Sequence, residues 1–362
     1  MTWQYQKILK KILGEGDVQY EPRTEEYILG ISGSMSTYDL RNGIPLVTTK
    51  KLSSQLPFEE LFWKLRGERN VKPLVDRNVN IWTANAFDRH LRTKGLEKKF
   101  PKHTPKWNSE FEDYSKRIKS DKKFANAAGD LGPVYGYNWR NDKDSKGNNI
   151  DQLTNAISGI KDRPGSRYHV LSSWNVSRLS DMAIGPCPFW HQFSVFGNKF
   201  LDLTVVQRSN DIFLGVPFNL DQDALFLEMM AAETGLIPRY FHHQTINTHA
   251  YLGVAPRADF WMEEKNVKEF QERFRKIRNR DGYLELKEWY SQNSPSESEG
   301  NERKDHIPFI LEQLSHGPKK SPKLNFIQEI PFMEAIQLPP LEVVEIEGYV
   351  PHKWDSKAVM AS

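Results

Sequence analysis

The chain has 362 residues, of which 38% are apolar, and a formal net charge of +3. This length predicts a single elaborated domain over residues 1–362, and the small net charge does not require a polyanionic partner. The single cysteine excludes an intramolecular disulfide framework and a multi-cysteine zinc site. The sequence contains no apolar run near the roughly 20 residues that span a membrane and no signal-peptide pattern, so we expect a soluble, cytoplasmic protein.

Apolar residues recur at helical spacing between positions 8 and 13, and Gly14 and Gly16 follow them. This pattern predicts a helix near the N-terminus that ends at these glycines. A second helix is predicted from about 56 to 65, with one buried apolar face. Further on, residues 201–206 have the pattern of a strand, and residues 224–232 have that of a helix buried on most sides. The sequence has no repeat with a period between about 20 and 50 residues, which argues against a solenoid or a propeller.

Two segments differ in composition from the rest of the chain. Residues 86–127 are rich in lysine and arginine with interspersed aromatics, which predicts a basic surface insertion. Residues 291–320 form a second predicted insertion, and its first part, up to about residue 306, is strongly polar. Such a segment buries too little apolar surface to offset its ordering entropy, so we expect it to be flexible.

The only cysteine, Cys187, lies between Pro186 and Pro188 and precedes a strand-like segment, Phe193–Phe196. A lone cysteine is more often a small buried apolar residue than a nucleophile. A nearby guanidinium would raise the thiolate fraction, and Arg208 is the candidate for this role. The residue pattern leaves both interpretations open.

Arg208 and Ser209 follow the predicted strand, where a guanidinium and a hydroxyl can share one phosphate. The alternative for this arginine is an ordinary surface ion pair. Asn219 precedes the predicted helix near Asp221, so it suits an N-cap. Its carboxamide also offers one acceptor and two donors, which match the edge of uracil.

His249 and Tyr251 lie two residues apart, so on an extended segment they point to the same side and can hold a sugar hydroxyl. The neighbouring pair His242 and His243 has no carboxylate or cysteine at an accepted ligand spacing, so we expect no metal site. The glycines between 129 and 136 do not form a dinucleotide fingerprint, and the chain has no P-loop motif.

Taken in order, these motifs resemble those of thymidylate synthases and related pyrimidine nucleotide hydroxymethylases. The matching segments are Pro45–Lys50, Phe58–Trp63, Asn80–Trp82, Asp130–Gly136, Ser166–Arg167, Ser173–Val176, Pro186–Cys187, Gln207–Ser209, Asp211–Gly215, Pro217–Asn219, Thr248–Tyr251 and Ile346–Tyr349. The resemblance implies an α+β fold with a large mixed sheet, packed helices and a homodimer formed by one sheet face. It also implies shared active sites.

The same resemblance assigns roles to individual residues. It implies that Cys187 attacks carbon 6 of a pyrimidine nucleotide, which makes carbon 5 nucleophilic toward the one-carbon unit of methylenetetrahydrofolate, without a metal. Glu60, Tyr135 and His249 match a proton-transfer network. The implied nucleotide ligands are Arg23, Arg167 from the other subunit, Gln207, Arg208, Ser209, Asn219, His249 and Tyr251. The implied folate ligands are Lys50, Trp82, Asp211, Leu214 and Gly215.

Asn219 matches family members that act on deoxyuridylate, whereas a deoxycytidylate hydroxymethylase type has aspartate at this position. Several residues depart from the synthase pattern. They are Thr24–Tyr27 in place of a glycine-threonine repeat, Thr83 and Asn85 in place of an acidic residue and a second tryptophan, Tyr168 in place of an arginine, Pro188 in place of a histidine, and Ser362 in place of an apolar residue.

These departures fall where a synthase excludes water and holds its folate. Our leading hypothesis is therefore a deoxyuridylate hydroxymethylase that makes 5-hydroxymethyl-dUMP. A thymidylate synthase that makes dTMP and dihydrofolate is the alternative, and hydroxymethylation of a cytidine nucleotide is a further one. Similar hydroxymethylases occur in viruses of bacteria, and such an origin would place this chain in a host cytoplasm.

A protein of another class remains as an alternative. The basic insertion, with Trp107, Phe111 and Tyr114, has the combination of cations and aromatics that binds nucleic acid. A solvated surface elaboration explains the same composition, and we favour it, so a nucleic-acid partner is not expected.

Overall fold

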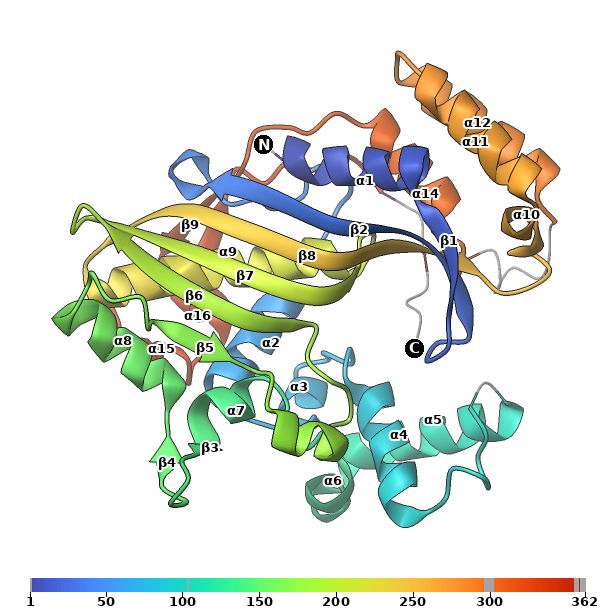
Figure 1. Ribbon diagram of the computed structural model, residues 1–362. Helices are drawn as coiled ribbons and strands as arrows, with labels where there is room; N and C mark the ends of the chain where they lie inside the picture. The colour runs from blue at the N-terminus through green and yellow to red at the C-terminus, as the bar shows by residue number, and fades with distance from the viewer. Residues whose placement is uncertain (1, 103, 296–302, 355–357, 359–362) are drawn as a thin grey trace.

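The computed structural model describes residues 2–102, 104–295, 303–354 and 358. A six-stranded sheet runs in the order β1-β2-β8-β7-β6-β5 (Figure 1). Its strands are β1 (Asp17–Glu21), β2 (Glu26–Asp39), β5 (Val170–Ser172), β6 (Pro188–Phe196), β7 (Phe200–Asp211) and β8 (Ile237–Gly253). Neighbouring strands are antiparallel except β7 and β8, which are parallel, so the expected mixed sheet is confirmed.

Helices cover one face of this sheet. The long helix α9 (Gly215–Thr234) connects β7 to β8, and α2 (Gln55–Leu65), α8 (Gln152–Asp162) and α1 (Trp3–Glu15) join the same core (Figure 1). Phe193 of β6 packs edge-on against Phe226 of α9, with ring centroids 5.2 Å apart. The helices predicted near the N-terminus and at 56–65 are confirmed by α1 and α2.

The opposite face of the sheet presents cross-strand rows of side chains. One row joins Trp190, Val206, Gln244 and Met35 across four strands. Met35 is 64% exposed in the single chain, and Ile246 of β8 is 48% exposed. An antiparallel or mixed sheet commonly faces water on one side, but apolar residues in such a row suit a protein contact.

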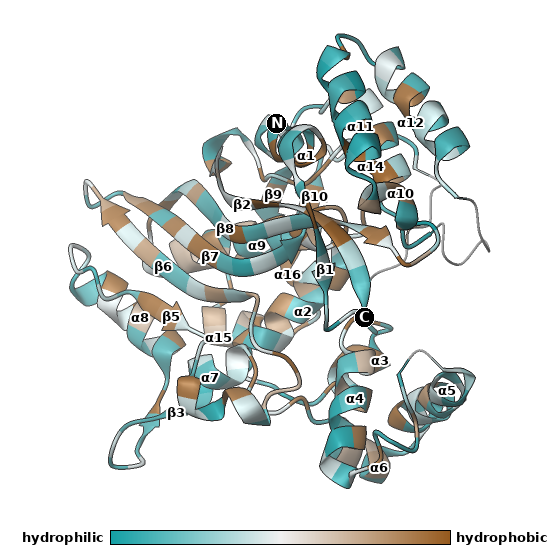
Figure 2. Ribbon diagram, turned by 45° about the vertical axis from the view of Figure 1, so that its right-hand side comes forward, coloured by the Kyte–Doolittle hydropathy of each residue, from teal (hydrophilic) through white to brown (hydrophobic). Residues whose placement is uncertain are grey.

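Shorter elements surround the sheet. They are η1 (Leu40–Asn42), α3 (Lys72–Asp76), α4 (Thr83–Lys94), α5 (Pro105–Ser120), α6 (Lys122–Ala128), α7 (Gly136–Asn141), β3 (Asp142–Lys143), β4 (Asn149–Ile150), η2 (Val176–Asp181), α10 (Asp259–Met262), α11 (Glu264–Lys276), α12 (Asp281–Asn293), α14 (Ile307–Ser315), β9 (Lys323–Phe326), α15 (Phe332–Ala335), α16 (Pro340–Val343) and β10 (Val344–Glu347). The helices α11 and α12 project from one end of the molecule, and α11 is mostly hydrophilic (Figure 2).

The basic segment 86–127 is helical and has an apolar cluster of its own. Phe87 of α4 packs against Trp107 and Tyr114 of α5, with ring centroids 5.2 and 4.9 Å away. Trp107 and Tyr114 are buried, and Phe111 stacks on Trp107. The suggestion that these aromatics stack on nucleic-acid bases is therefore wrong, because they stabilise this helical segment itself.

The prediction of a flexible segment over 291–320 is wrong for much of its length. α12 continues to Asn293, and Asp305 and His306 are fully buried. Helix α14 then buries Ile307, Ile310 and other apolar residues at helical spacing, which gives this part of the segment its own contribution to the core. Residues 296–302, the most polar stretch, lie outside the described residues.

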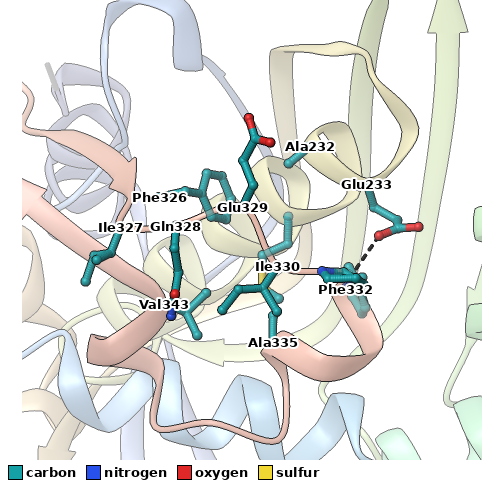
Figure 3. A pocket seen from close by; sticks show the side chains of 12 residues that line it. Ala232, Glu233, Phe326, Ile327, Gln328, Glu329, Ile330, Phe332, Ala335 and Val343 are labelled. Carbon is teal, nitrogen blue, oxygen red and sulfur yellow. Dashed lines mark hydrogen bonds between the residues drawn. The ribbon is translucent and has the colours of Figure 1, made fainter.

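A cavity of about 860 Å³ lies between the end of α9 and the segment that leads from β9 to α16 (Figure 3). Apolar side chains such as Phe326, Ile330 and Val343 line it, and Glu233 accepts a hydrogen bond from the backbone N–H of Phe332 at 2.9 Å. Its lining includes none of the predicted site residues. Among the helices that the structure describes, none is both long and apolar enough to cross a membrane.

Candidate functional site

Cys187 lies where two cavities meet at one edge of the sheet. The larger cavity has a volume of about 630 Å³ and the smaller about 250 Å³. Seven residues line both cavities: Arg23, Ile184, Cys187, Ser209, Asn210, Asp211 and Gly215. The thiol is thus half-buried at a junction between two compartments, and the interpretation of Cys187 as an inert core residue is wrong.

Hydrogen bonds fix the backbone around the cysteine. The Cys187 N–H donates to the Tyr135 hydroxyl at 3.2 Å, and its carbonyl accepts from the Arg208 N–H at 2.9 Å. The Arg208 guanidinium donates to the carbonyls of Gly185 and Pro186 at 2.6 and 3.0 Å. The segment before β6 therefore cannot move without breaking several bonds, which holds the sulfur in a set position.

The smaller cavity carries the groups expected to bind a phosphorylated sugar. Arg23, Arg208 and Ser209 line it together with His249 and Tyr251, whose rings are perpendicular with centroids 5.1 Å apart. Two guanidinium groups and a hydroxyl are suited to a phosphate, because guanidinium forms charge-assisted hydrogen bonds with it. Sequence reasoning correctly brought these five residues together, and β8 confirms that His249 and Tyr251 lie on one extended strand.

Burial lowers the pKa of His249 to about 4, so its ring is neutral at pH 7. Its Nδ1 lies 2.7 Å from the amide oxygen of Asn247, which can only accept. Nδ1 therefore carries the proton, and Nε2 is left as an acceptor. A neutral ring with a free acceptor can bind a hydroxyl or a water molecule in the cavity.

The larger cavity has a flat aromatic wall beside a carboxylate. The indole N–H of Trp82 donates to Glu60 at 2.9 Å, and the rings of Trp82 and Tyr135 are 5.5 Å apart. Leu56 and Ile81 add apolar surface to the lining. This combination of flat apolar surface and one polar group suits a fused heterocycle.

Tyr135 is held in a strained conformation. Its φ of 37° lies in the left-handed region, which non-glycine residues seldom adopt. The next residue must be glycine, since a Cβ at Gly136 would lie 1.7 Å from the Lys64 carbonyl of α2. Burial raises the pKa of Tyr135 well above its ordinary value, and the neighbouring Cys187 adds to this effect, so the phenol stays protonated.

Asp211 shapes the turn from β7 into α9. Its Oδ1 accepts from the N–H groups of Phe213 and Leu214 at 2.8 and 3.0 Å. Burial alone would raise the pKa of Asp211, but His306, 3.6 Å away, and the Leu214 N–H outweigh it and lower the pKa. Asp211 is therefore ionised in the wall that both cavities share.

Asn219 lines the larger cavity and is only half-buried. The prediction that it caps the helix near Asp221 is wrong, because α9 begins at Gly215 and includes Asn219. The helix starts earlier than expected since Pro217 is tolerated in a first turn. The carboxamide is therefore not used as a cap.

Four predicted ligands do not belong to the lining of these cavities. Lys50 is buried, donates to the Phe213 carbonyl and has a pKa lowered by burial to about 7, and Leu214 packs against the core. Gln207 accepts hydrogen bonds from His243 at 2.8 Å and from Asn210 at 3.2 Å, so it helps to hold Asn210, which lines both cavities. Arg167 is exposed elsewhere. Their binding roles stay predictions.

Sequence reasoning missed two residues beside Glu60. Lys64 lies on the same helix four residues later and lines the larger cavity, and Gln222 of α9 contacts both side chains. The available signal was a lysine at the i,i+4 position from a glutamate, inside a helix whose other residues are mostly buried.

The sequences of known proteins resemble this sequence over most of the chain. A family model for thymidylate synthase matches residues 3–361. The thymidylate synthases of Mesoplasma florum and Mycoplasma genitalium are 38% and 39% identical over 249 and 248 residues, which cover 69% and 68% of this chain and 81% and 80% of theirs. The Mycoplasma mobile enzyme is 38% identical over 265 residues, 73% of this chain and 86% of the relative.

The chain belongs to the thymidylate synthase family. It is therefore an enzyme, a one-carbon transferase with methylenetetrahydrofolate as its co-substrate. The two joined cavities fit this chemistry, since one has phosphate-binding groups and the other a flat aromatic wall. Thymidylate synthases need no metal, and within the described residues no cluster of three or more histidine, cysteine, aspartate or glutamate side chains could hold one.

The buried histidines make the stability of this enzyme depend on pH. Burial lowers the pKa of His243 to about 4 from its ordinary value of about 6.5. Because the unfolded state binds this proton first, the stabilisation is present above about pH 6.5 and is lost as the pH falls toward 4. The unfolding free energy should fall between pH 7 and pH 5 in both proteins. For His243→Gln, we expect this fall to be about 2 kcal/mol smaller than for the wild type.

Urea unfolding at the two pH values measures this difference. His242→Gln is the matched comparison on the opposite side of the same strand. Burial also lowers the pKa of the half-buried His242, so this variant should show a change in the same direction but smaller than that of His243→Gln. Equal pH dependence in the wild type and His243→Gln would contradict the prediction.

Proposed function

We propose that the chain is a thymidylate synthase, which converts dUMP to dTMP and methylenetetrahydrofolate to dihydrofolate. The observation that carries this proposal is the position of Cys187, at the junction of a phosphate-binding cavity and an aromatic-walled cavity. A nucleotide with its phosphate and sugar in the first cavity and its base at the junction, beside Asn219 and Glu60, would meet a folate in the second cavity next to one sulfur. The relatives that match most of the chain are named thymidylate synthases, and this supports the same product.

Covalent catalysis lets the residues of the site divide a difficult substitution into easier steps. The Cys187 thiolate adds to carbon 6 of the pyrimidine, and carbon 5 becomes nucleophilic and takes the one-carbon unit. Carbon 5 then loses its proton as the tetrahydrofolate amine leaves, which gives an exocyclic methylene, and the thiolate is expelled once hydride reaches this methylene. Glu60 and its neighbours manage the protons. Methylenetetrahydrofolate supplies the carbon and then the hydride that makes the methyl group.

Asn219 supports a uridylate as the acceptor. Its carboxamide faces the larger cavity, whose lining also includes Cys187. An amide can accept from the N–H and donate to the carbonyl on the edge of uracil. The edge of cytosine presents the opposite pattern at both positions and would need the reversed amide. The preference for uridylate therefore rests on the match of Asn219 to family members that act on deoxyuridylate.

The second candidate product is 5-hydroxymethyl-dUMP, which requires water rather than hydride to reach the transferred carbon. The observation that favours it is that Pro188 and Asn85, two departures from the synthase pattern, line the larger cavity. Two other departures, Thr83 and Tyr168, are not part of the lining of that cavity. Thr83 is buried, and Tyr168 is 91% exposed. Ser362 lies outside the described residues.

Trp82 supports hydride transfer in spite of these departures. Its indole is fixed by the hydrogen bond to Glu60 and by the Tyr135 ring, so the aromatic wall does not depend on a second tryptophan. A folate held against this wall would stay close to the transferred carbon. For this reason we favour dTMP as the product.

We also propose that the enzyme is a homodimer that joins through the open face of the sheet, with shared sites. The apolar rows on that face support this arrangement. So does Arg167, which is exposed and lies outside both cavities of its own chain, as a ligand donated to a partner's phosphate site would. The cytoplasmic location stays a prediction.

The mass of the nucleotide product tests the proposed reaction. Given dUMP and methylenetetrahydrofolate, the enzyme should add CH₂ to the nucleotide and form one dihydrofolate per turnover, which absorbance and mass spectrometry follow together. Addition of CH₂O without dihydrofolate would establish the hydroxymethylase instead. Reaction with dCMP but not dUMP would contradict the role of Asn219, and Cys187→Ala controls for background.

Mixing two inactive variants tests the shared sites. We expect Cys187→Ala and Arg167→Ala to be strongly impaired alone, whereas co-refolding them should restore activity toward about a quarter of the wild-type value, because half the dimers gain one intact site. If Cys187 and Arg167 of one chain serve the same site, co-refolding will not restore activity, and this result would contradict shared sites.

A further inference from the structure

Glu60 belongs to a closed ring of polar contacts that joins α2 to α9. One carboxylate oxygen accepts from Lys64 and from the Trp82 indole, each at 2.9 Å. The other accepts from the side-chain amide of Gln222, whose own oxygen accepts from Lys64 at 2.9 Å. Both carboxylate oxygens of Glu60 are thus oriented by protein donors.

The ring is almost fully buried, yet it borders the site. Lys64 is 4% exposed and Gln222 is 3% exposed, while Glu60 and Lys64 line the larger cavity. Burying an ammonium and a carboxylate carries a desolvation cost, and well-packed apolar residues are often equally or more stable in such places. Stability alone therefore does not account for a lysine at this buried position of α2.

Lys64 is the cation that the structure brings into direct contact with Glu60. From the segment before α7, the Tyr135 ring lies 4.8 Å below the Lys64 ammonium, and burial raises the pKa of Tyr135, so it is uncharged. Cys187 and Arg208 lie beyond this tyrosine, on the far side of its hydroxyl.

From α9, two carboxyl groups flank Gln222. Burial raises the pKa of Asp221 well above its ordinary value, which favours its neutral form. Asp223 pairs with His191 at 3.2 Å, away from the ring. The charge nearest to Glu60 is therefore positive, and the group that α9 itself places against Glu60 is a neutral amide.

We propose that Lys64 and Gln222 are positioning residues that keep a positive charge against Glu60 and hold its carboxylate in one orientation for proton transfer at the pyrimidine. A cation in contact favours the charged form of a buried carboxylate, and two fixed donors prevent its rotation. This inference rests on the proposed nucleotide site but not on which product forms, because both products require the same proton transfers at carbon 5.

Substitution of Lys64 by methionine, which is of similar length, removes the charge. We expect Lys64→Met to lower kcat at neutral pH by at least about tenfold. The acid limb of its kcat profile should also move to higher pH, because the variant lacks the positive charge that contacts the carboxylate. Lys64→Arg keeps the charge, so its acid limb should stay where the wild type has it, even if its rate is lower.

Lys72→Met is the matched control. Lys72 also forms an i,i+4 pair, with Asp76 on the neighbouring helix α3, but that pair is exposed and outside the site. Its pH profile and kcat should equal those of the wild type. A Lys64→Met enzyme whose activity falls equally at every pH, or does not fall, overturns the proposal.

Gln222→Met provides a test if Lys64→Met does not fold. It removes the bridging amide and leaves the Lys64–Glu60 pair, so kcat should fall and the acid limb should shift in the same direction by a smaller amount. An unchanged profile overturns the proposal. If the wild type forms no product from dUMP, the proposed function fails, whereas variants that match an active wild type refute only this inference.

Discussion

The parallel pairing of β7 and β8 is the constraint on which the site depends. Two consecutive strands can run parallel only if the chain crosses over between them, and α9 makes this crossover against the helical face of the sheet. The ends of both strands and the beginning of α9 therefore meet at one edge. Asp211 lies beside His249 there, and Ser209 lies beside Asn247.

Every other group of the site is placed relative to that edge. Cys187 is bonded to the end of β7 through the backbone of Arg208. The strained Tyr135 and the glycine after it press against α2, and α2 in turn contacts α9 through Glu60 and Gln222. Residues distant in the sequence thus converge because one crossover fixes two strands and one helix.

Motifs allowed much of the site to be predicted from the sequence. The order of strands and the alternation of side chains pointed to Cys187, Arg208, Ser209 and the pair on β8 as candidates. Only the resemblance decided between the functional and the ordinary interpretation of Cys187. The resemblance supplied Glu60, Trp82 and Tyr135. Lys64 and Gln222 were not predicted, since a lysine in a buried helix reveals a role only when its tertiary partner is known.

The two segments predicted to be insertions show where composition is a poor guide. Lysine and arginine dominate 86–127, but a minority of aromatics in α4 and α5 suffices to build a cluster. In the second insertion, polar residues around 291–306 concealed the apolar periodicity of α14, and Asp305 is buried because it accepts from Arg257 and Tyr290, each at 2.8 Å. Tertiary pairing of charges cannot be read from local composition.

The central claim, that Cys187 bonds covalently to a nucleotide between the two cavities, is tested most directly with 5-fluoro-dUMP. The fluorine replaces the proton that carbon 5 must lose, so the adduct cannot break down. With methylenetetrahydrofolate present, intact-protein mass spectrometry should show one nucleotide and one folate added, on the peptide that contains Cys187, and nothing added to Cys187→Ser. An unmodified wild-type protein, or a label on another residue, would contradict the account.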